Sequence, residues 1–125
     1  MLTKSEEQII ELLWNFDEPL TSSEIIKNSV DKTWKDSYVH LLINSLMEKG
    51  IIEVAGFKKA TKNYARTFKP TMSREEYWFL NLTKSKNFTP SQLPMFFKSF
   101  LANTNELQLL NEFEAIIRKR KAELS

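Results

Sequence analysis

The hydrophobic residues of the first fifty positions recur with the spacing of three short helices. A capping box, Thr-x-x-Glu, at residues 3–6 precedes an apolar stripe that ends near Phe16. A second capping box at residues 21–24 opens a short helix. A third apolar stripe follows a turn at residues 31–33 and ends at Gly50, which can take the left-handed conformation that terminates helices. The pattern therefore predicts three helices with a tight turn between the second and the third.

The spacing of hydrophobic positions changes to that of strands after Gly50. Residues 51–55 are β-branched or apolar except for Glu53, and residues 63–69 alternate until Pro70 stops the pattern. Residues 56–59 between them are turn-like, so we expect a hairpin whose lysine-rich turn lies around Gly56. Three helices followed by a hairpin are the element order of a winged helix-turn-helix.

The rest of the chain continues as helices. Ser73 and Glu76 form another capping box, and two later apolar stripes predict helices at residues 93–101 and from about Asn105 onward. The predicted fold class is mainly α with a small β-hairpin. We expect an N-terminal winged helix-turn-helix DNA-binding domain at residues 1–70 and a C-terminal helical dimerisation domain at residues 71–125.

The second predicted domain is rich in aromatic residues for its length. Eight of the fifteen aromatic side chains in the chain lie beyond Pro70, and three short helices bury little apolar area by themselves. One interpretation is a small core packed on the winged helix. The interpretation we favour is a module in which each chain completes the core of a second copy, giving a homodimer. The expected dimerisation residues are Tyr77, Trp78, Phe96, Phe97, Phe100, Leu110, Phe113 and Ile117.

Composition argues against several classes of protein. The chain has no cysteine and a single histidine, so it offers no disulfide framework, thiolate metal site or imidazole cluster. It has only two glycines, and the sequence suggests neither a phosphate-binding loop nor a nucleophile with its base. No apolar run approaches the roughly 18 residues of a membrane helix. We expect no catalysis, cofactor, metal or membrane association, and a cytoplasmic location.

Charge is distributed unevenly along the chain. The net charge of +2 indicates little by itself. Residues 4–31 carry two basic against seven acidic side chains, whereas residues 32–69 carry eight basic against three acidic. One side of the winged helix is therefore expected to face the phosphates of double-stranded DNA.

The third helix and the hairpin supply the candidate DNA-binding residues. A helical wheel directs Ser37, His40, Leu41 and Asn44 outward. Asn can pair with adenine, and Leu can lie against a thymine methyl group, while lysines in the hairpin suit phosphate contacts. Alternatively, these are merely solvated side chains. The candidate residues are Lys35, Ser37, Tyr38, His40, Leu41, Asn44, Ser45, Lys58, Lys59, Lys62 and Arg66.

Several short motifs follow one another along the chain. They are Leu-Leu-Trp at residues 12–14, Leu-Thr-Ser-Ser-Glu-Ile-Ile at residues 20–26, Trp34, Leu-Ile-Asn-Ser-Leu-Met-Glu-Lys-Gly at residues 42–50 and Pro-Thr-Met-Ser-Arg-Glu-Glu-Tyr at residues 70–77. In this order and spacing they resemble the penicillinase and methicillin-resistance repressor family. The resemblance implies a dimeric winged-helix transcriptional repressor that binds an inverted-repeat operator.

The sequence departs from the family pattern at several positions. The family usually has Thr where Tyr38 and Leu41 stand, and a basic residue where Ser45 stands. The cysteine cluster of the copper-responsive branch is absent. In the antibiotic-responsive branch a sensor protease cuts an Asn-Phe bond, and Ser99-Phe100 aligns loosely with it. The resemblance therefore leaves open the question whether a sensor protease is a partner of this protein.

Two other functions remain open from the sequence. In a winged-helix protein-interaction module, Tyr38 and Leu41 would contact a partner protein. In a small-molecule-responsive regulator, an effector pocket would lie among Trp78, Phe96, Phe97 and Phe100.

Overall fold

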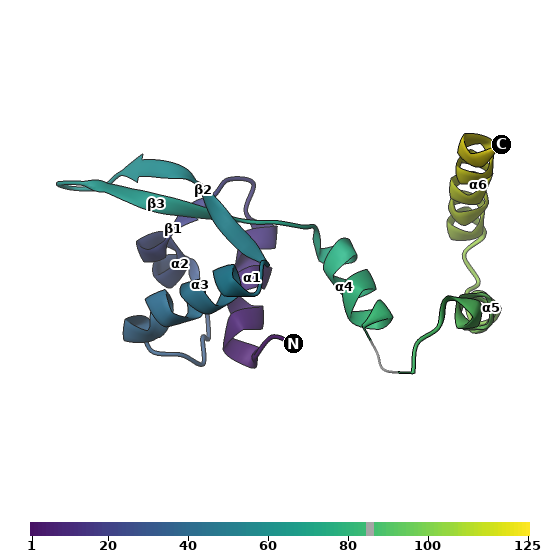
Figure 1. Ribbon diagram of the computed structural model, residues 1–125, viewed down its shortest axis with the longest axis horizontal. Coiled ribbons are helices and arrows are strands. Elements are labelled where there is room, and N and C mark those ends of the chain that lie inside the picture. Colours follow the sequence, from purple (N-terminus) through teal and green to yellow (C-terminus); the bar gives the residue numbers. More distant parts are fainter. Residues whose placement is uncertain (85–86) are drawn as a thin grey trace. The chain divides into compact units, whose positions relative to one another are not determined.

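A computed structural model describes residues 1–84 and 87–125 of the chain (Figure 1). The chain divides into two compact units, Met1–Lys84 and Ser85–Ser125. The elements of the first unit are α1 (Lys4–Asn15), β1 (Leu20–Thr21), α2 (Ser22–Asn28), the 3₁₀ turn η1 (Asp36–Tyr38), α3 (Val39–Glu48), β2 (Ile52–Lys59), β3 (Tyr64–Pro70) and α4 (Arg74–Thr83). The second unit contains η2 (Pro90–Gln92), α5 (Leu93–Ala102) and α6 (Leu107–Leu124).

The helices of the first unit begin and end at the signals found in the sequence. The Thr3 hydroxyl accepts a hydrogen bond from the Glu6 amide at 3.2 Å, and the Glu6 carboxylate accepts one from the Thr3 amide at 2.8 Å. Thr21 and Glu24 repeat this reciprocal arrangement at the start of α2. Gly50, with φ of 73°, follows α3 in the left-handed conformation. The predicted capping boxes at residues 3–6 and 21–24 and the predicted helix end at Gly50 are therefore confirmed, because each depends only on residues close in sequence. At the start of α4 only half of the predicted box is formed: the Ser73 hydroxyl accepts from the Glu76 amide.

The strands form one antiparallel sheet in the order β1-β3-β2. The expected hairpin turn around Gly56 is wrong, since residues 56–59 belong to β2. The chain turns at residues 60–63, where the Ala60 amide donates to the Asn63 carbonyl at 2.6 Å. Gly56 instead adjoins a register shift after Val54, the type of irregularity at which glycine is common.

The core of the first unit lies between the three N-terminal helices and the sheet. Its most completely buried side chains are Ile9, Ile10, Leu20, Ile25, Ile43 and Leu46. Ile43 and Leu46 belong to the apolar stripe of α3, which was predicted to face inward. The predicted fold class is confirmed: the chain is mainly helical with a small sheet in a winged-helix arrangement, followed by further helices.

Helix α4 packs on α1 within the first unit. Tyr77 is buried with its ring centroid 5.6 Å from that of Trp14, whose Nε1 donates to the Met72 carbonyl at 2.9 Å. Arg74 forms an ion pair with Glu11 at 2.8 Å. Tyr77 was predicted at a dimer interface, but the structure places it in the core of its own chain because Trp14 provides a partner ring. The domain boundary near residue 70 was predicted from the end of the hairpin pattern at Pro70, and it stays a prediction.

The second unit has no buried residue among residues 87–125. Phe100 of α5 and Phe113 of α6 meet edge to face, with ring centroids 5.9 Å apart. Phe96 and Phe97 form a second edge-to-face pair. Only the pair of Phe100 and Phe113 joins the two helices, because Phe96 and Phe97 both belong to α5, and much of the apolar surface of α5 and α6 is exposed.

Within the described residues, no helix combines the length and the apolar character that crossing a membrane requires.

Candidate nucleic-acid interface

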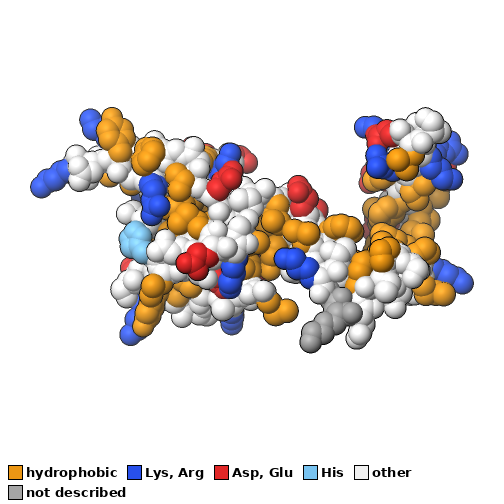
Figure 2. Space-filling view, viewed as in Figure 1, with side chains coloured by type: hydrophobic (Ala, Val, Ile, Leu, Met, Phe, Trp, Pro, Cys, Tyr) orange, Lys and Arg blue, Asp and Glu red, His pale blue; other side chains and the backbone are white. Residues whose placement is uncertain are grey.

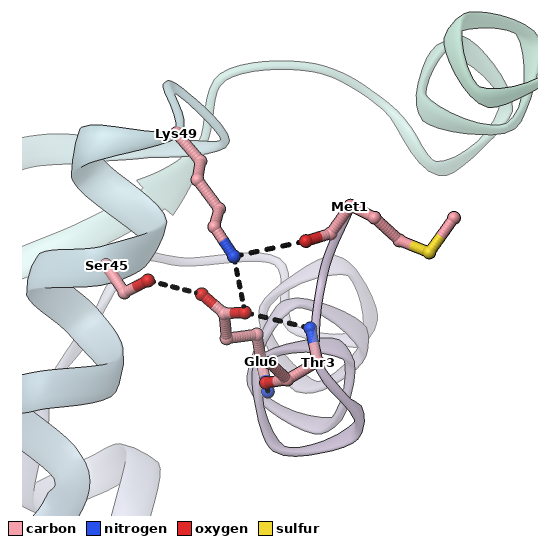
Figure 3. Close-up of polar contacts among 5 residues, drawn as sticks. All are labelled: Met1, Thr3, Glu6, Ser45 and Lys49. Carbon is pink, nitrogen blue, oxygen red and sulfur yellow. Dashed lines mark hydrogen bonds and ion pairs between the residues drawn. The ribbon is translucent and has the colours of Figure 1, made fainter. Parts of the chain in front are cut away.

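A buried glutamate fixes α3 to α1 (Figure 3). Glu6 of α1 is 1% exposed, and its carboxylate accepts hydrogen bonds from the Ser45 hydroxyl of α3 at 2.6 Å and from Lys49 Nζ at 2.7 Å. The Thr3 amide donates to the same carboxylate, and Lys49 Nζ also donates to the Met1 carbonyl at 3.1 Å. The C-terminal end of α3 is thereby held at a defined position on α1.

The charge of Glu6 is stabilised where it is buried. Burial by itself opposes ionisation of the carboxyl, but the hydrogen bonds from Lys49, Ser45 and Thr3 outweigh it and lower the pKa of Glu6 to about 2. The contact between α1 and α3 is therefore a charged one at neutral pH.

The beginning of α3 is held by aromatic and charged contacts. Trp34 is 6% exposed in the core, and Lys32 Nζ lies 5.6 Å from the centre of its ring. Lys32 also forms an ion pair with Asp36 of η1 at 2.8 Å. Both ends of α3 are thus positioned by residues outside it, which orients its exposed face.

The exposed face of α3 and η1 contains the predicted contact residues. Ser37, Tyr38, His40, Leu41 and Asn44 are all exposed, as the helical wheel predicted. Tyr38 and Leu41 are 50% and 64% exposed and border an open hollow of about 430 Å³ beside the start of α3. Lys35, immediately before η1, is also exposed and lines the same hollow.

The hairpin of β2 and β3, which we call the wing, has two different faces. Cross-strand pairing sets Phe57 opposite Arg66 and Lys59 opposite Tyr64, so these four side chains share one face. All four are exposed. Lys58 lies on the other face, where its Nζ is 2.7 Å from the Glu24 carboxylate. Figure 2 shows Lys and Arg side chains gathered at the end of the wing.

The ion pair between Lys58 and Glu24 changes the acidity of both groups. The hydrogen bond to Glu24 raises the pKa of Lys58, and the same bond lowers the pKa of Glu24. Glu24 also accepts from the Thr21 amide, so one carboxylate both caps α2 and holds β2 close to the turn of the wing.

A protein-family comparison matches residues 2–118 of the chain to the penicillinase repressor family. The chain belongs to the penicillinase repressor family. Its general class is therefore that of a DNA-binding transcriptional repressor.

Other comparisons add little to this family assignment. None of the curated proteins compared with the chain matches it. The crystal structure of Bacillus subtilis PadR in complex with operator DNA is similar over 99% of this chain and 72% of that chain, with 19% sequence identity and a TM-score of 0.49. At this level of similarity, no role of a PadR residue is assigned to a residue of this chain.

Two predicted contact residues, Ser45 and Lys58, form a hydrogen bond or an ion pair within the chain, and the guanidinium of a third, Arg66, lies 5.4 Å from the centre of the Phe68 ring. Ser45 is half-buried and its hydroxyl donates to Glu6, so it stands on the inner side of α3 and not on the exposed face. Lys58 is paired with Glu24. Both partners lie more than thirty residues away in sequence, so no local pattern indicated them.

Two exposed aromatic residues of the wing were not singled out from the sequence. Phe57 and Tyr64 are each 70% exposed and share a face with Lys59 and Arg66. The alternation of residues 63–69 contained the signal for Tyr64, but the assignment of residues 56–59 to a turn concealed the strand position of Phe57.

The remaining predicted site residues lie outside the winged helix proper. Trp78 lies on α4 of the first unit, whereas Phe96, Phe97 and Phe100 lie on α5 of the second unit. The Ser99-Phe100 bond lies inside α5, where the Ser99 hydroxyl donates to the Met95 carbonyl. The effector pocket and cleavage by a protease both stay predictions.

Proposed function

We propose that the protein is a homodimeric, sequence-specific repressor that binds an inverted-repeat operator in double-stranded DNA. The observation that carries the proposal is the exposed face of α3, which is positioned by the contacts of Glu6 and Trp34, in the same unit as a wing that carries exposed lysines. A helix presented in this way fits the major groove, and a basic hairpin fits the adjoining phosphates.

The contact residues divide between base contacts and phosphate contacts. The residues on η1 and α3 that are proposed to contact bases are Ser37, Tyr38, His40, Leu41 and Asn44. Lys35, just before η1, is proposed to contact the nearest phosphate. On the wing, Lys59, Lys62 and Arg66 are proposed to contact phosphates. Ser45 is left out, and Lys58 contributes only if its ion pair with Glu24 opens.

The second unit is proposed to form the dimer. Its exposed aromatic and aliphatic side chains gather over α5 and the adjoining part of α6 (Figure 2). A second copy would bury this surface, and the two-fold symmetry of a dimer would match the symmetry of an inverted repeat. The proposed interface residues are Phe96, Phe97, Phe100, Leu110, Phe113 and Ile117, with Trp78 of α4 as an additional contact.

A fluorescence anisotropy titration tests the proposal. The probes are duplexes from the DNA upstream of the coding sequence of the protein, with a shuffled duplex as reference, at about 50 and 200 mM salt. We expect tighter binding to one upstream duplex and a steep loss of affinity with salt. Absence of both a sequence preference and a salt dependence would contradict the proposal.

Lys59→Ala provides the variant for the wing. It should weaken binding to specific and shuffled duplexes by similar factors and reduce the salt slope by about 0.9, since about one phosphate contact is lost. Lys119→Ala removes the same charge from α6 and is the matched control. Equal salt slopes for Lys59→Ala and Lys119→Ala would show that Lys59 does not contact a phosphate.

A further inference from the structure

The helix proposed to enter the major groove lacks the side chains that bind guanine. Arg or Lys bonded to O6 and N7 of guanine is the commonest specific contact in that groove. Helix α3, from Val39 to Glu48, contains neither Lys nor Arg, and Lys35 stands four residues before it. The helix itself therefore supplies no bidentate cation for a guanine.

Two apolar side chains occupy the exposed face instead. Tyr38 and Leu41 are three residues apart, which makes them neighbours on the helix surface, and they border the same hollow. Each is at least half exposed, so neither is needed by the hydrophobic core. The C5-methyl group of thymine is the apolar group that the major groove presents.

We propose that α3 recognises A·T pairs, with Leu41 and Tyr38 packed against thymine methyl groups and Asn44 bonded to adenine. Asn44 follows Leu41 by three residues and is exposed on the same face. Its amide can donate to N7 and accept from N6 of adenine. The inference rests on the proposed function and specifies the base chemistry that the site selects.

The experiment begins with full-length protein and a pool of random-sequence duplexes. Sequences enriched by binding are identified, and each thymine of an enriched duplex is then replaced singly by deoxyuridine, which lacks only the C5-methyl group. At one or more positions in each half-site we expect the dissociation constant to rise about fourfold, the size expected for one buried methyl group. Replacements in the flanking sequence should have no effect.

Substitutions connect the effect to named side chains. With Leu41→Ala and with Tyr38→Ala, the duplexes with thymine and with deoxyuridine should have nearly equal dissociation constants at the position that the substituted side chain contacts. Asn44→Ala is the matched control, because it should lose discrimination at adenine and retain the methyl effect. All three residues are exposed, so thermal melting curves should match that of the parent protein.

The outcomes separate this inference from the function on which it rests. Failure to enrich any sequence would contradict both. Enriched duplexes that bind equally well with deoxyuridine would overturn the thymine contact alone. A methyl effect that persists unchanged in both the Leu41 and the Tyr38 variants would also overturn it, since another residue would then contact the methyl group.

Discussion

Glu6 holds the C-terminal end of α3, and its contribution to stability depends on pH. Its pKa of about 2 lies below the value of about 4.3 for glutamate in an unfolded chain. Between these values the unfolded chain binds more protons than the folded one, so stability falls as pH falls. The stabilisation is complete above about pH 4.5 and is lost as pH approaches 2.

Glu6→Gln should remove this pH dependence. In the parent protein the free energy of unfolding should fall by on the order of 3 kcal/mol between pH 5 and pH 2 through this group. Urea unfolding at a series of pH values measures it. Glu7→Gln, on the exposed part of the same helix, is the control and should keep the parent pH profile. A Glu6→Gln profile parallel to that of the parent would contradict the role of this carboxylate.

At the residue scale, the sequence predicts which side chains are exposed better than it predicts which residues they contact. The outward positions of His40, Leu41 and Asn44 follow from helical periodicity, and the structure confirms them. The partners of Ser45 and Lys58 could not be predicted, because both are distant in sequence. Packing of α1 beside α3 brings Glu6 to Ser45, and packing of α2 beside β2 brings Glu24 to Lys58.

At the scale of elements, the sequence predicts the starts of helices better than it predicts the turn of the wing. The helix starts were predictable because capping boxes are local. The wing turn was not, because Gly56 is as suited to a bulge as to a turn and only the pairing of β2 with β3 distinguishes them. Two lysines assigned to the turn, Lys58 and Lys59, therefore lie on opposite faces of a strand.

Release of Lys58 from Glu24 should strengthen DNA binding. Glu24→Gln retains a side chain that can cap α2, because Gln at this position also accepts from the Thr21 amide. It removes the carboxylate that competes with phosphate for Lys58. We expect an affinity for duplex DNA about two- to fivefold higher, the range of an exposed ion pair, and a salt slope steeper by about 0.9.

Anisotropy titrations at several salt concentrations measure both changes. Glu114→Gln on α6 changes the net charge equally and is the control, so its effect should be smaller than that of Glu24→Gln. An unchanged salt slope in Glu24→Gln would show that Lys58 stays away from the phosphates even when released.

At the scale of the whole molecule, the two units differ in what they need for stability. The first unit has a continuous core, extended by Tyr77 of α4. Residues 87–125 include none that is buried, although this part holds many of the aromatic side chains. Composition indicated this imbalance, but it could not assign Tyr77 to the core of the first unit, because that depends on the ring of Trp14.

Placing a charge on the apolar surface of α6 tests the proposed dimer. Ile117 is 57% exposed in the single chain and would be buried by a second copy. An interfacial carboxylate without a partner is costly, so Ile117→Asp should raise the dimer dissociation constant at least about tenfold. Sedimentation velocity measures this, and Gln108→Asp, an exposed position of the same helix, is the control with the same added charge.

The same variant links the dimer to operator binding. A monomer retains α3 and the wing, so Ile117→Asp should still bind a half-site duplex as the parent does. It should lose the additional affinity that two linked winged helices have for a complete inverted repeat. Phe97→Asp on α5 repeats the test from the neighbouring helix. If both variants remain dimers, the apolar surface of α5 and α6 is not the interface. If they become monomers that bind the full repeat unchanged, the operator does not require two copies.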